Sequence, residues 1–334
     1  MSKKAYKTSM VVIFLLPAML LFLSVLIAPI VMSVYYSLFD MRNSFATSSE
    51  NFVGLQNYVD LLTGDRPLLL NLFDKYILGK EVALPVSSFR FWKALENSLL
   101  LAILSVFLQL PMSLGLALML GRGIKGERGF LSLYFMPVLI STTVIGQLWK
   151  KIYNPSYGIL NAVLGMLGFD YQSIMPQGGW LGNATSAIWC VFVPTLWQYV
   201  GYHMLLMYAG VRSVSPELRE AAKLDGATEG QVDRYVVLPC IKPIIKVSVI
   251  FAVTGSLKSF DLLYILNPGG DMNFTTKVPS TLMYNLLFLQ WRYGTGSAIA
   301  VMMIILCFAF ALIISAVFKE REGHGRKKHS EQKQ

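Results

Sequence analysis

The chain has 334 residues, of which 54% are hydrophobic and 14% are charged, and its formal net charge is +10. Soluble proteins average about 45–50% apolar and about 25% charged residues, so this composition argues against an ordinary soluble domain and predicts an integral membrane protein. The excess positive charge is then expected at membrane faces, and no nucleic-acid partner is predicted. The three cysteines are far apart in the sequence and form no cluster with ligand spacing, so neither a disulfide framework nor a metal site is predicted.

Membrane-spanning segments are the main feature of the chain. A hydrocarbon core about 30 Å thick requires about 20 mainly apolar residues per helix, and helices satisfy their own backbone hydrogen bonds in lipid. Six segments meet this need: 10–38, 94–120, 130–149, 184–211, 244–266 and 295–318. The first is too long for the roughly 7–15 residue core of a signal peptide, so it is predicted to be retained. The expected fold is an all-α integral membrane protein with about six transmembrane helices.

The distribution of Lys and Arg predicts the orientation. With a cytoplasmic N-terminus, the inner segments carry 17 basic residues in 66, and the outer segments carry 10 in 117. Positive charge concentrates on cytoplasmic faces, so the chain is expected to be a multi-pass protein of the cell membrane with both termini cytoplasmic. The basic tail 319–334 is predicted to anchor this topology, with contact to anionic membrane lipid as the alternative.

The cytoplasmic loop 212–243, between the fourth and fifth spans, is too long to be a simple turn. Ser215 suits the N-cap of a helix, and Pro216 suits the first helical position. Gly226 can adopt the left-handed conformation that ends a helix. A second short helix is expected from Thr228. The loop is thus predicted to hold a short capped helix outside the bilayer.

Two dipeptides complete the prediction for this loop. Leu238-Pro239 is expected to break the chain before the fifth span, because proline lacks a backbone donor. Ala221 and Ala222 are expected to form one surface small enough for close docking. A helix that is joined closely to membrane spans on both sides is suited to transmit a displacement from a soluble partner to the helix bundle.

The residues of the loop follow a spaced pattern: Glu220-Ala221-Ala222, Asp225-Gly226-Ala227, Val236 and Leu238-Pro239. This pattern resembles the EAA loop of ATP-binding-cassette (ABC) importer permeases, with Val236 in place of the usual Ile. The Asp225-Gly226-Ala227 triplet is similar to the form common in carbohydrate-importer permeases. Other segments are also similar to that family, so the resemblance covers about residues 10–318: Phe52-Val53-Gly54-Leu55-Gln56-Asn57-Tyr58, Phe135-Met136-Pro137, Tyr153-Asn154-Pro155 and Phe260-Asp261-Leu262.

The resemblance implies a type I ABC importer permease fold and a division of the chain. Residues 1–93 would hold the N-terminal tail, the first helix and a long outer loop, residues 94–318 the permease core with its coupling loop 212–243, and residues 319–334 the basic tail. The residues implied to couple to an ATPase are Glu220, Ala221, Ala222, Asp225, Gly226, Ala227, Leu238 and Pro239.

The same resemblance implies the partners. Two cytoplasmic ABC ATPase subunits would bind ATP and Mg²⁺, an extracytoplasmic solute-binding protein would deliver a sugar, and a second permease subunit would complete a heterodimer. This chain would bind no cofactor and would not be an enzyme. The sequence independently supports the expectation that another polypeptide binds ATP, since it contains no G-x-x-x-x-G-K-[ST] loop to cradle phosphates.

Polar residues within the spans are candidates for the solute path, because they are costly in lipid. Lys258 and Asp261 are three residues apart, so on one helix they would share a face and either pair or line the path. The predicted path also includes Asn97, Gln198, Tyr199 and His203. Similar groups are offered by Gln109, Gln147, Trp197 and Tyr264. Interhelical hydrogen bonding or an interfacial anchor is the alternative for each. Whether this chain or its partner holds the solute site is left open.

Three glycines within the predicted spans are expected to permit close helix contacts: Gly201, Gly210 and Gly255.

Two other classes of function are alternatives. A secondary transporter or channel for a polar solute would often show repeated halves, which are not evident here. A membrane enzyme would need a catalytic cluster, and no catalytic residues are predicted. The form of the loop favours a sugar or oligosaccharide as cargo, with polyols, glycerol phosphates or another polar solute as alternatives.

The predicted topology can be tested with an epitope tag at residue 324, in the basic tail. We expect labelling of the tag only after the cytoplasmic membrane has been opened, because the tail is predicted to lie inside. Labelling of intact cells would overturn the orientation.

Overall fold

The computed structural model describes residues 14–42, 49–63, 91–175, 179–182, 184–267 and 276–318. Within these ranges the chain forms helices joined by turns, with two isolated β-bridges. It divides into two compact units, Met1–Leu95 with Val278–Ile305, and Glu96–Lys277 with Leu306–Gln334. The basic tail and most of the long outer loop lie outside the described residues.

The first unit contains the first span and the start of the last one. Its elements in chain order are the helix Phe14–Tyr36, which includes the π-helical turn η1 (Phe22–Ile27) and α2 (Ala28–Tyr36), then η2 (Ser49–Asn51), α3 (Gln56–Thr63), α16 (Pro279–Tyr284), η5 (Asn285–Leu289) and the first half of α17 (Tyr293–Val317).

Buried Asn57, from the segment that resembles the family's lead-in to the second span, organises this unit. Its amide donates to the carbonyls of Ser37 and Phe39 at 2.8 and 3.0 Å, and it accepts a hydrogen bond from Thr295 at 3.3 Å. One side chain therefore fixes the turn after α2 to the start of α17.

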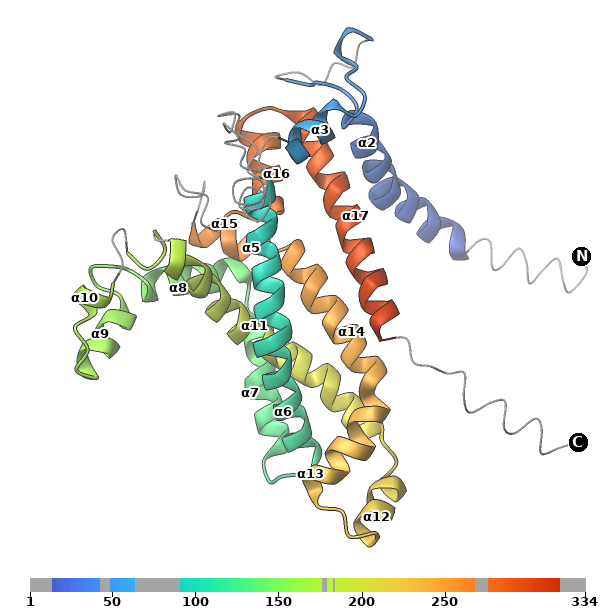
Figure 1. Ribbon diagram of the computed structural model, residues 1–334, viewed down its shortest axis with the longest axis vertical. Helices are drawn as coiled ribbons and strands as arrows, with labels where there is room; N and C mark the ends of the chain where they lie inside the picture. Colours follow the sequence, from blue (N-terminus) through green and yellow to red (C-terminus); the bar gives the residue numbers. More distant parts are fainter. Residues whose placement is uncertain are drawn as a thin grey trace, which may run out of the picture. The chain divides into compact units, whose positions relative to one another are not determined.

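The second unit contains the loop and most of the polar span residues. Its elements are α5 (Phe91–Leu104, which begins in the first unit), η3 (Ser105–Gln109), α6 (Leu110–Gly121), α7 (Glu127–Leu139), α8 (Thr142–Ile152), α9 (Ile159–Met166), α10 (Tyr171–Ile174), α11 (Ala184–Ser213), α12 (Pro216–Leu224), α13 (Glu229–Val232), η4 (Asp233–Val237), α14 (Leu238–Leu257) and α15 (Asp261–Leu266). Figure 1 shows α12 and α13 at one end of this unit, and α8 and α15 towards the other.

Among the described residues, four helices are long and apolar enough to cross a membrane: Phe14–Tyr36, Phe91–Gly121, Glu229–Leu266 and Tyr293–Val317. The first, second, fifth and sixth predicted spans are thereby confirmed as apolar helices. A fifth span results if α7 and α8 count as one broken span, since they meet at a bend of 92°. Residues 130–149 are thus not straight, because Ile140 and Ser141 are extended.

Helix α11 corresponds to the fourth predicted span, 184–211. It has 30 residues, enough to cross a bilayer, but polar residues such as Gln198 and His203 keep it below the hydropathy of the other spans. Both of these side chains are buried. Because α11 packs against α6, α7 and α14, its polar groups face protein rather than lipid.

The predicted break at Leu238-Pro239 is wrong. Helices α13, η4 and α14 run on without interruption from Glu229 to Leu257. The wider π-helical turn η4 ends two residues before Pro239, and irregular turns of this kind accommodate a proline within a helix. The chain breaks later, at residues 258–260, between α14 and α15.

Two of the three expected glycine contacts are confirmed. A Cβ atom on Gly201 would lie 1.9 Å from the carbonyl oxygen of Tyr134 in α7, and one on Gly210 would lie 2.3 Å from Ile244 Cδ1 in α14. The expectation for Gly255 is wrong, since no atom of another described element lies within 4 Å of its Cβ position. Gly255 instead lines an open cavity.

The contact at Gly201 predicts a loss of stability on substitution. Gly201→Ala would force α11 away from α7, and overpacking of this kind costs about 1–3 kcal/mol. Gly115→Ala in α6 is the matched control, because its new methyl group would meet no atom of another element within 4 Å in the part of the chain that the structure describes. Thermal unfolding in detergent should show a lower midpoint for Gly201→Ala alone, and equal midpoints would contradict the close contact.

Candidate functional site

The loop between α11 and α14 holds a short helix, α12, with a well-defined end. Ser215 occupies its N-cap position, although its side chain makes no capping hydrogen bond. Gly226 has a φ of +84°, as expected for a left-handed helix end. Its N–H donates to Lys223 O, and Ala227 N–H donates to Ala222 O, both at 3.0 Å. These two bonds form a Schellman motif, which glycine favours.

The spacing of the loop pattern follows from this motif. Ala222 and Ala227, joined by the backbone hydrogen bond, both pack against a small apolar core. The buried members of that core come from α11, the following turn, α13, η4 and α14: Val211, Val214, Val232, Val237 and Ile241. A small residue three positions before the helix end and another after the glycine therefore allow α12 to lie close to the bundle.

Much of the rest of α12 is exposed. Glu220, Ala221 and Asp225 are exposed, and Leu218 and Leu224 are 51% and 89% exposed. The expectation that both alanines share one docking surface is therefore half wrong, since Ala222 faces the apolar core and Ala221 faces outward. Leu224, two residues after Ala222, lies on the side of α12 away from the apolar core, where it is accessible to a protein partner.

Polar contacts also hold the loop to the bundle. Arg219 of α12 donates a hydrogen bond to the carbonyl of Val211 at the end of α11. Asp233, the first residue of η4, accepts a hydrogen bond from Arg122 at 2.5 Å, just beyond the end of α6. This bond raises the pKa of Arg122 above its ordinary value. Leu238 packs beside the apolar core, whereas Pro239 is exposed.

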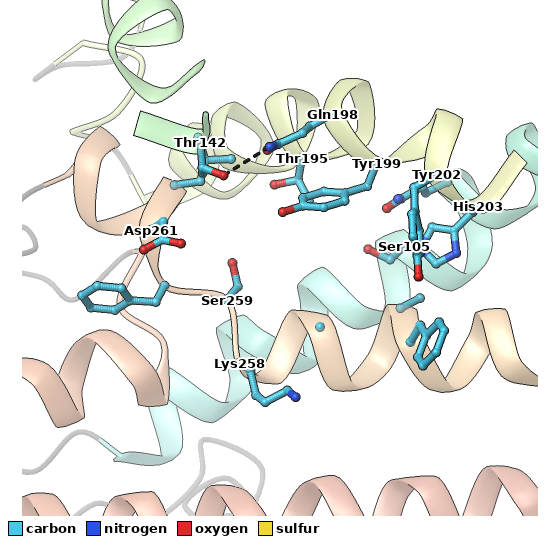
Figure 2. Close-up of a pocket in the computed structure, with 16 residues that line it drawn as sticks. Ser105, Thr142, Thr195, Gln198, Tyr199, Tyr202, His203, Lys258, Ser259 and Asp261 are labelled. Carbon is cyan, nitrogen blue, oxygen red and sulfur yellow. Dashed lines mark hydrogen bonds between the residues drawn. The ribbon is translucent and has the colours of Figure 1, made fainter. Parts of the chain in front are cut away.

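A cavity of about 340 Å³ lies within the second unit. One wall is the middle of α11, and the other walls come from η3, the start of α8, the end of α14 and the break before α15. Figure 2 shows side chains of α11 on one side and those of residues 258–261 on the other. The polar lining residues are Ser105, Gln109, Thr142, Thr195, Gln198, Tyr199, Tyr202, His203, Lys258, Ser259 and Asp261.

Two helix breaks frame this cavity. Thr142 begins α8 after the bend, and Asp261 begins α15 after the break at 258–260. Gln198 Nε2 of α11 donates to Thr142 Oγ1 at 3.2 Å, as drawn in Figure 2. Helices α8 and α15 lie against each other, where Gly146 meets Ile265. Irregular backbone at membrane depth is tolerated where it lines such a cavity.

Five of the six residues predicted for the solute path line this cavity: Gln198, Tyr199, His203, Lys258 and Asp261. Asn97 does not, and its buried amide donates instead to the carbonyl of Lys277 at 2.8 Å. The premise that Lys258 and Asp261 share a helical face is wrong, because the helix breaks between them. The described residues show no ion pair between these two side chains, which point apart in Figure 2.

Several lining residues were missing from the predicted set: Ser105, Thr142, Thr195, Tyr202 and Ser259. Thr195 and Tyr202 lie three residues before Gln198 and three after Tyr199, so the helical period of α11 places them on the same face. The helical period alone would therefore have identified Thr195 and Tyr202 as lining residues. Thr142 and Ser259 depend on the two helix breaks, which apolar composition does not reveal.

Two buried polar atoms of α11 lack partners among the described residues: Gln198 Oε1 and His203 Nδ1. Their residues are only 2% and 5% exposed, and both line the cavity. Unpaired buried polar groups are costly, but these two atoms are themselves enclosed by protein. The exposed polar side chains of the lining, which a solute with hydroxyl groups could reach, are Tyr199, Tyr202, Lys258 and Asp261. The tyrosine rings and Phe260 add apolar faces for a ring-shaped solute. Among the described residues, no group of three His, Cys, Asp or Glu could hold a metal ion.

Solved structures match this arrangement along most of the chain. A bacterial alginate ABC transporter, solved with a periplasmic protein bound to alginate pentasaccharide, has a chain with a TM-score of 0.74 and 22% identity. The match covers 94% of this chain and 95% of that one. The likeness supports the type I permease fold predicted above.

Curated relatives match in sequence over nearly the whole chain. A probable ABC transporter permease of Pyrococcus horikoshii is 31% identical, covering 95% of this chain and 97% of its own. The permease MalF of the trehalose/maltose transport system of Thermococcus litoralis is 28% identical, covering 92% of each. These relatives are named as transport permeases and not as enzymes.

The model of one protein family matches residues 93–322, which run from within α5 to beyond α17 and include the loop and the cavity. The family is described as the inner membrane component of binding-protein-dependent transport systems. The relative that is 31% identical over 95% of the chain agrees with this match. The protein therefore belongs to the family of binding-protein-dependent transport system inner membrane components, the permease subunits of ABC importers.

Proposed function

We propose that this chain forms the translocation path for a sugar or oligosaccharide and couples it to ATP hydrolysis through α12. The observation that carries the proposal is the position of α11. Its middle lines the cavity through Gln198, Tyr199 and His203, and its end holds α12 through the Arg219–Val211 hydrogen bond. A force applied to α12 from the cytoplasm would therefore reach the cavity through one continuous helix.

The cargo is proposed from two lines of support. Relatives of the chain are named for trehalose and maltose, for diacetylchitobiose and for starch degradation products. The cavity offers amide, hydroxyl, imidazole and carboxylate groups together with aromatic rings. Sugars need such donors and acceptors and bind well against aromatic faces. We therefore favour a sugar or oligosaccharide over another polar solute.

Separate partners supply the remaining functions. Two cytoplasmic ATPase subunits would bind ATP and Mg²⁺, and the exposed Leu218 and Leu224 would enter a cleft on one of them. An extracytoplasmic binding protein would deliver the sugar, and a second permease subunit would complete a heterodimer. Both termini would lie in the cytoplasm, on the same side as α12. The periplasmic protein in the complex of the similar alginate transporter supports the involvement of a binding protein.

The mechanism follows from these positions. Closure of the two ATPase subunits around ATP would displace α12 and its counterpart in the sister permease. The Schellman motif and the apolar contacts of Ala222 and Ala227 make α12 and the bundle move together. The movement would switch the cavity from inward-facing to outward-facing, where the binding protein releases its sugar. In this mechanism, ATP binding shifts the equilibrium between the inward-facing and the outward-facing state of the cavity.

Gly226→Asp should abolish ATP-coupled uptake. The Cβ position of Gly226 is open within this chain, so the new carboxylate would not clash internally but would project from the helix end into the ATPase interface. Gly226→Asn is the matched control, because asparagine has the same shape, lacks the charge and tolerates the left-handed conformation. Uptake into proteoliposomes containing the assembled importer would measure the effect.

We expect Gly226→Asn to keep a substantial part of the uptake and Gly226→Asp to lose almost all of it. Normal uptake by Gly226→Asp, at normal levels of assembled complex, would argue against the coupling role of α12.

Asp261→Asn should slow sugar import. Hydrogen bonds to a charged group contribute about 1.5–3 kcal/mol, so loss of the charge should lower the maximal uptake rate roughly tenfold. The matched control is Asn97→Ala, whose side chain lies outside the cavity lining and should affect thermal stability rather than the rate per folded importer. Wild-type transport by Asp261→Asn would remove this carboxylate from the solute path.

A further inference from the structure

An ion pair joins the end of α6 to the start of η4. Arg122 Nη2 lies 2.5 Å from Asp233 Oδ2, and the two residues are 111 positions apart in the sequence. The Asp233 side chain is 12% exposed, and that of Arg122 is 44% exposed. A carboxylate this deeply buried is strongly destabilised without its partner, so the pair holds the two segments together.

Both helices that this pair joins also line the cavity, through residues that lie further along each helix from the pair. The continuous helix that ends at Gly121 contributes Ser105 and Gln109 to the lining. The helix that continues from Asp233 contributes Phe251 and Gly255 before it ends beside Lys258. The pair thus fixes the loop-side ends of two helices whose other parts form the cavity walls.

The pair also closes a ring of contacts around the end of α11. Gly121 lies so close to Val211 that a Cβ atom on it would be 2.4 Å from Val211 Cγ1. Arg219 of α12 donates to the carbonyl of the same Val211. Helix α12 in turn packs against α13 and η4. Asp233, in η4, accepts the hydrogen bond from Arg122 at the end of α6. Helices α6, α11 and α12 and the η4 turn are therefore linked in a closed circuit.

We propose that Arg122 and Asp233 are positioning residues for energy coupling, an inference that rests on the proposed role of α12. The pair makes the ends of α6 and η4 move with α12, so that its displacement reaches both of these cavity walls as well as α11. Val236 and Val237 of η4 pack in the apolar core, and apolar contacts of this kind are non-directional. A short charge-assisted hydrogen bond fixes direction as well as distance.

Arg122→Gln tests the proposal in the complete importer, reconstituted in proteoliposomes with its binding protein. ATP hydrolysis should continue while sugar import falls, so that the ratio of sugar imported to ATP hydrolysed drops at least about fivefold, the lower end of typical coupling between sites. Arg122→Lys keeps the charge and should restore much of the ratio. A merely structural role would lower the amount of folded complex without changing this ratio.

Asp233→Asn has the same shape as the native residue and provides a second, independent variant. It should also lower the ratio, and the double variant with Arg122→Gln should be no worse than the more severe single variant, because both remove one interaction. The matched control is Arg42→Gln, which removes the exposed Arg42–Asp40 pair of 2.9 Å in the first unit and should leave the ratio unchanged.

The outcomes separate this inference from the proposed function. Wild-type ratios in both Arg122→Gln and Asp233→Asn would overturn the positioning role, even if Gly226→Asp still abolished uptake. Normal uptake in Gly226→Asp as well would overturn the coupling role of α12 on which the inference rests.

Discussion

The close packing of α11 against its neighbours is the constraint on which the rest of the second unit depends. Gly201 lies against the backbone of α7 and Gly210 lies against Ile244 of α14, so α11 is surrounded by protein where its polar residues occur. Lipid provides no hydrogen bonds, and the buried amide of Gln198 and imidazole of His203 would be unacceptable on a lipid-facing surface. Small residues thus make room for a polar helix inside an apolar protein.

This arrangement places two different sites on one helix. The middle of α11 lines a polar cavity, and its end carries a short helix with exposed leucines. The connection between them is a rigid helix with contacts at both ends, which is suited to transmit a displacement. Helices α6 and α14 provide a second connection, since the Arg122–Asp233 pair joins them at the same loop.

Much of this architecture could be predicted from the sequence because lipid imposes a strong pattern. Long apolar segments identified the spans, and the Ser215-Pro216 start and Gly226 end located α12 to within a residue. Polar residues are unusual in an apolar span, and this contrast identified Gln198, Tyr199 and His203 of α11. The breaks could not be predicted, since Pro239 is accommodated by a π-helical turn and the actual break at 258–260 contains no proline or glycine. The Arg122–Asp233 pair joins residues distant in sequence, and no local pattern reveals it.

The central claim is that α12 receives force from a cytoplasmic ATPase. A photoactivatable cross-linker in place of Leu224, the more exposed of the two α12 leucines, would test it in the assembled importer. The account predicts a cross-link to an ATPase subunit, and a change in its yield when ATP binds. The absence of any cross-link between this position and an ATPase subunit in the assembled importer would contradict it.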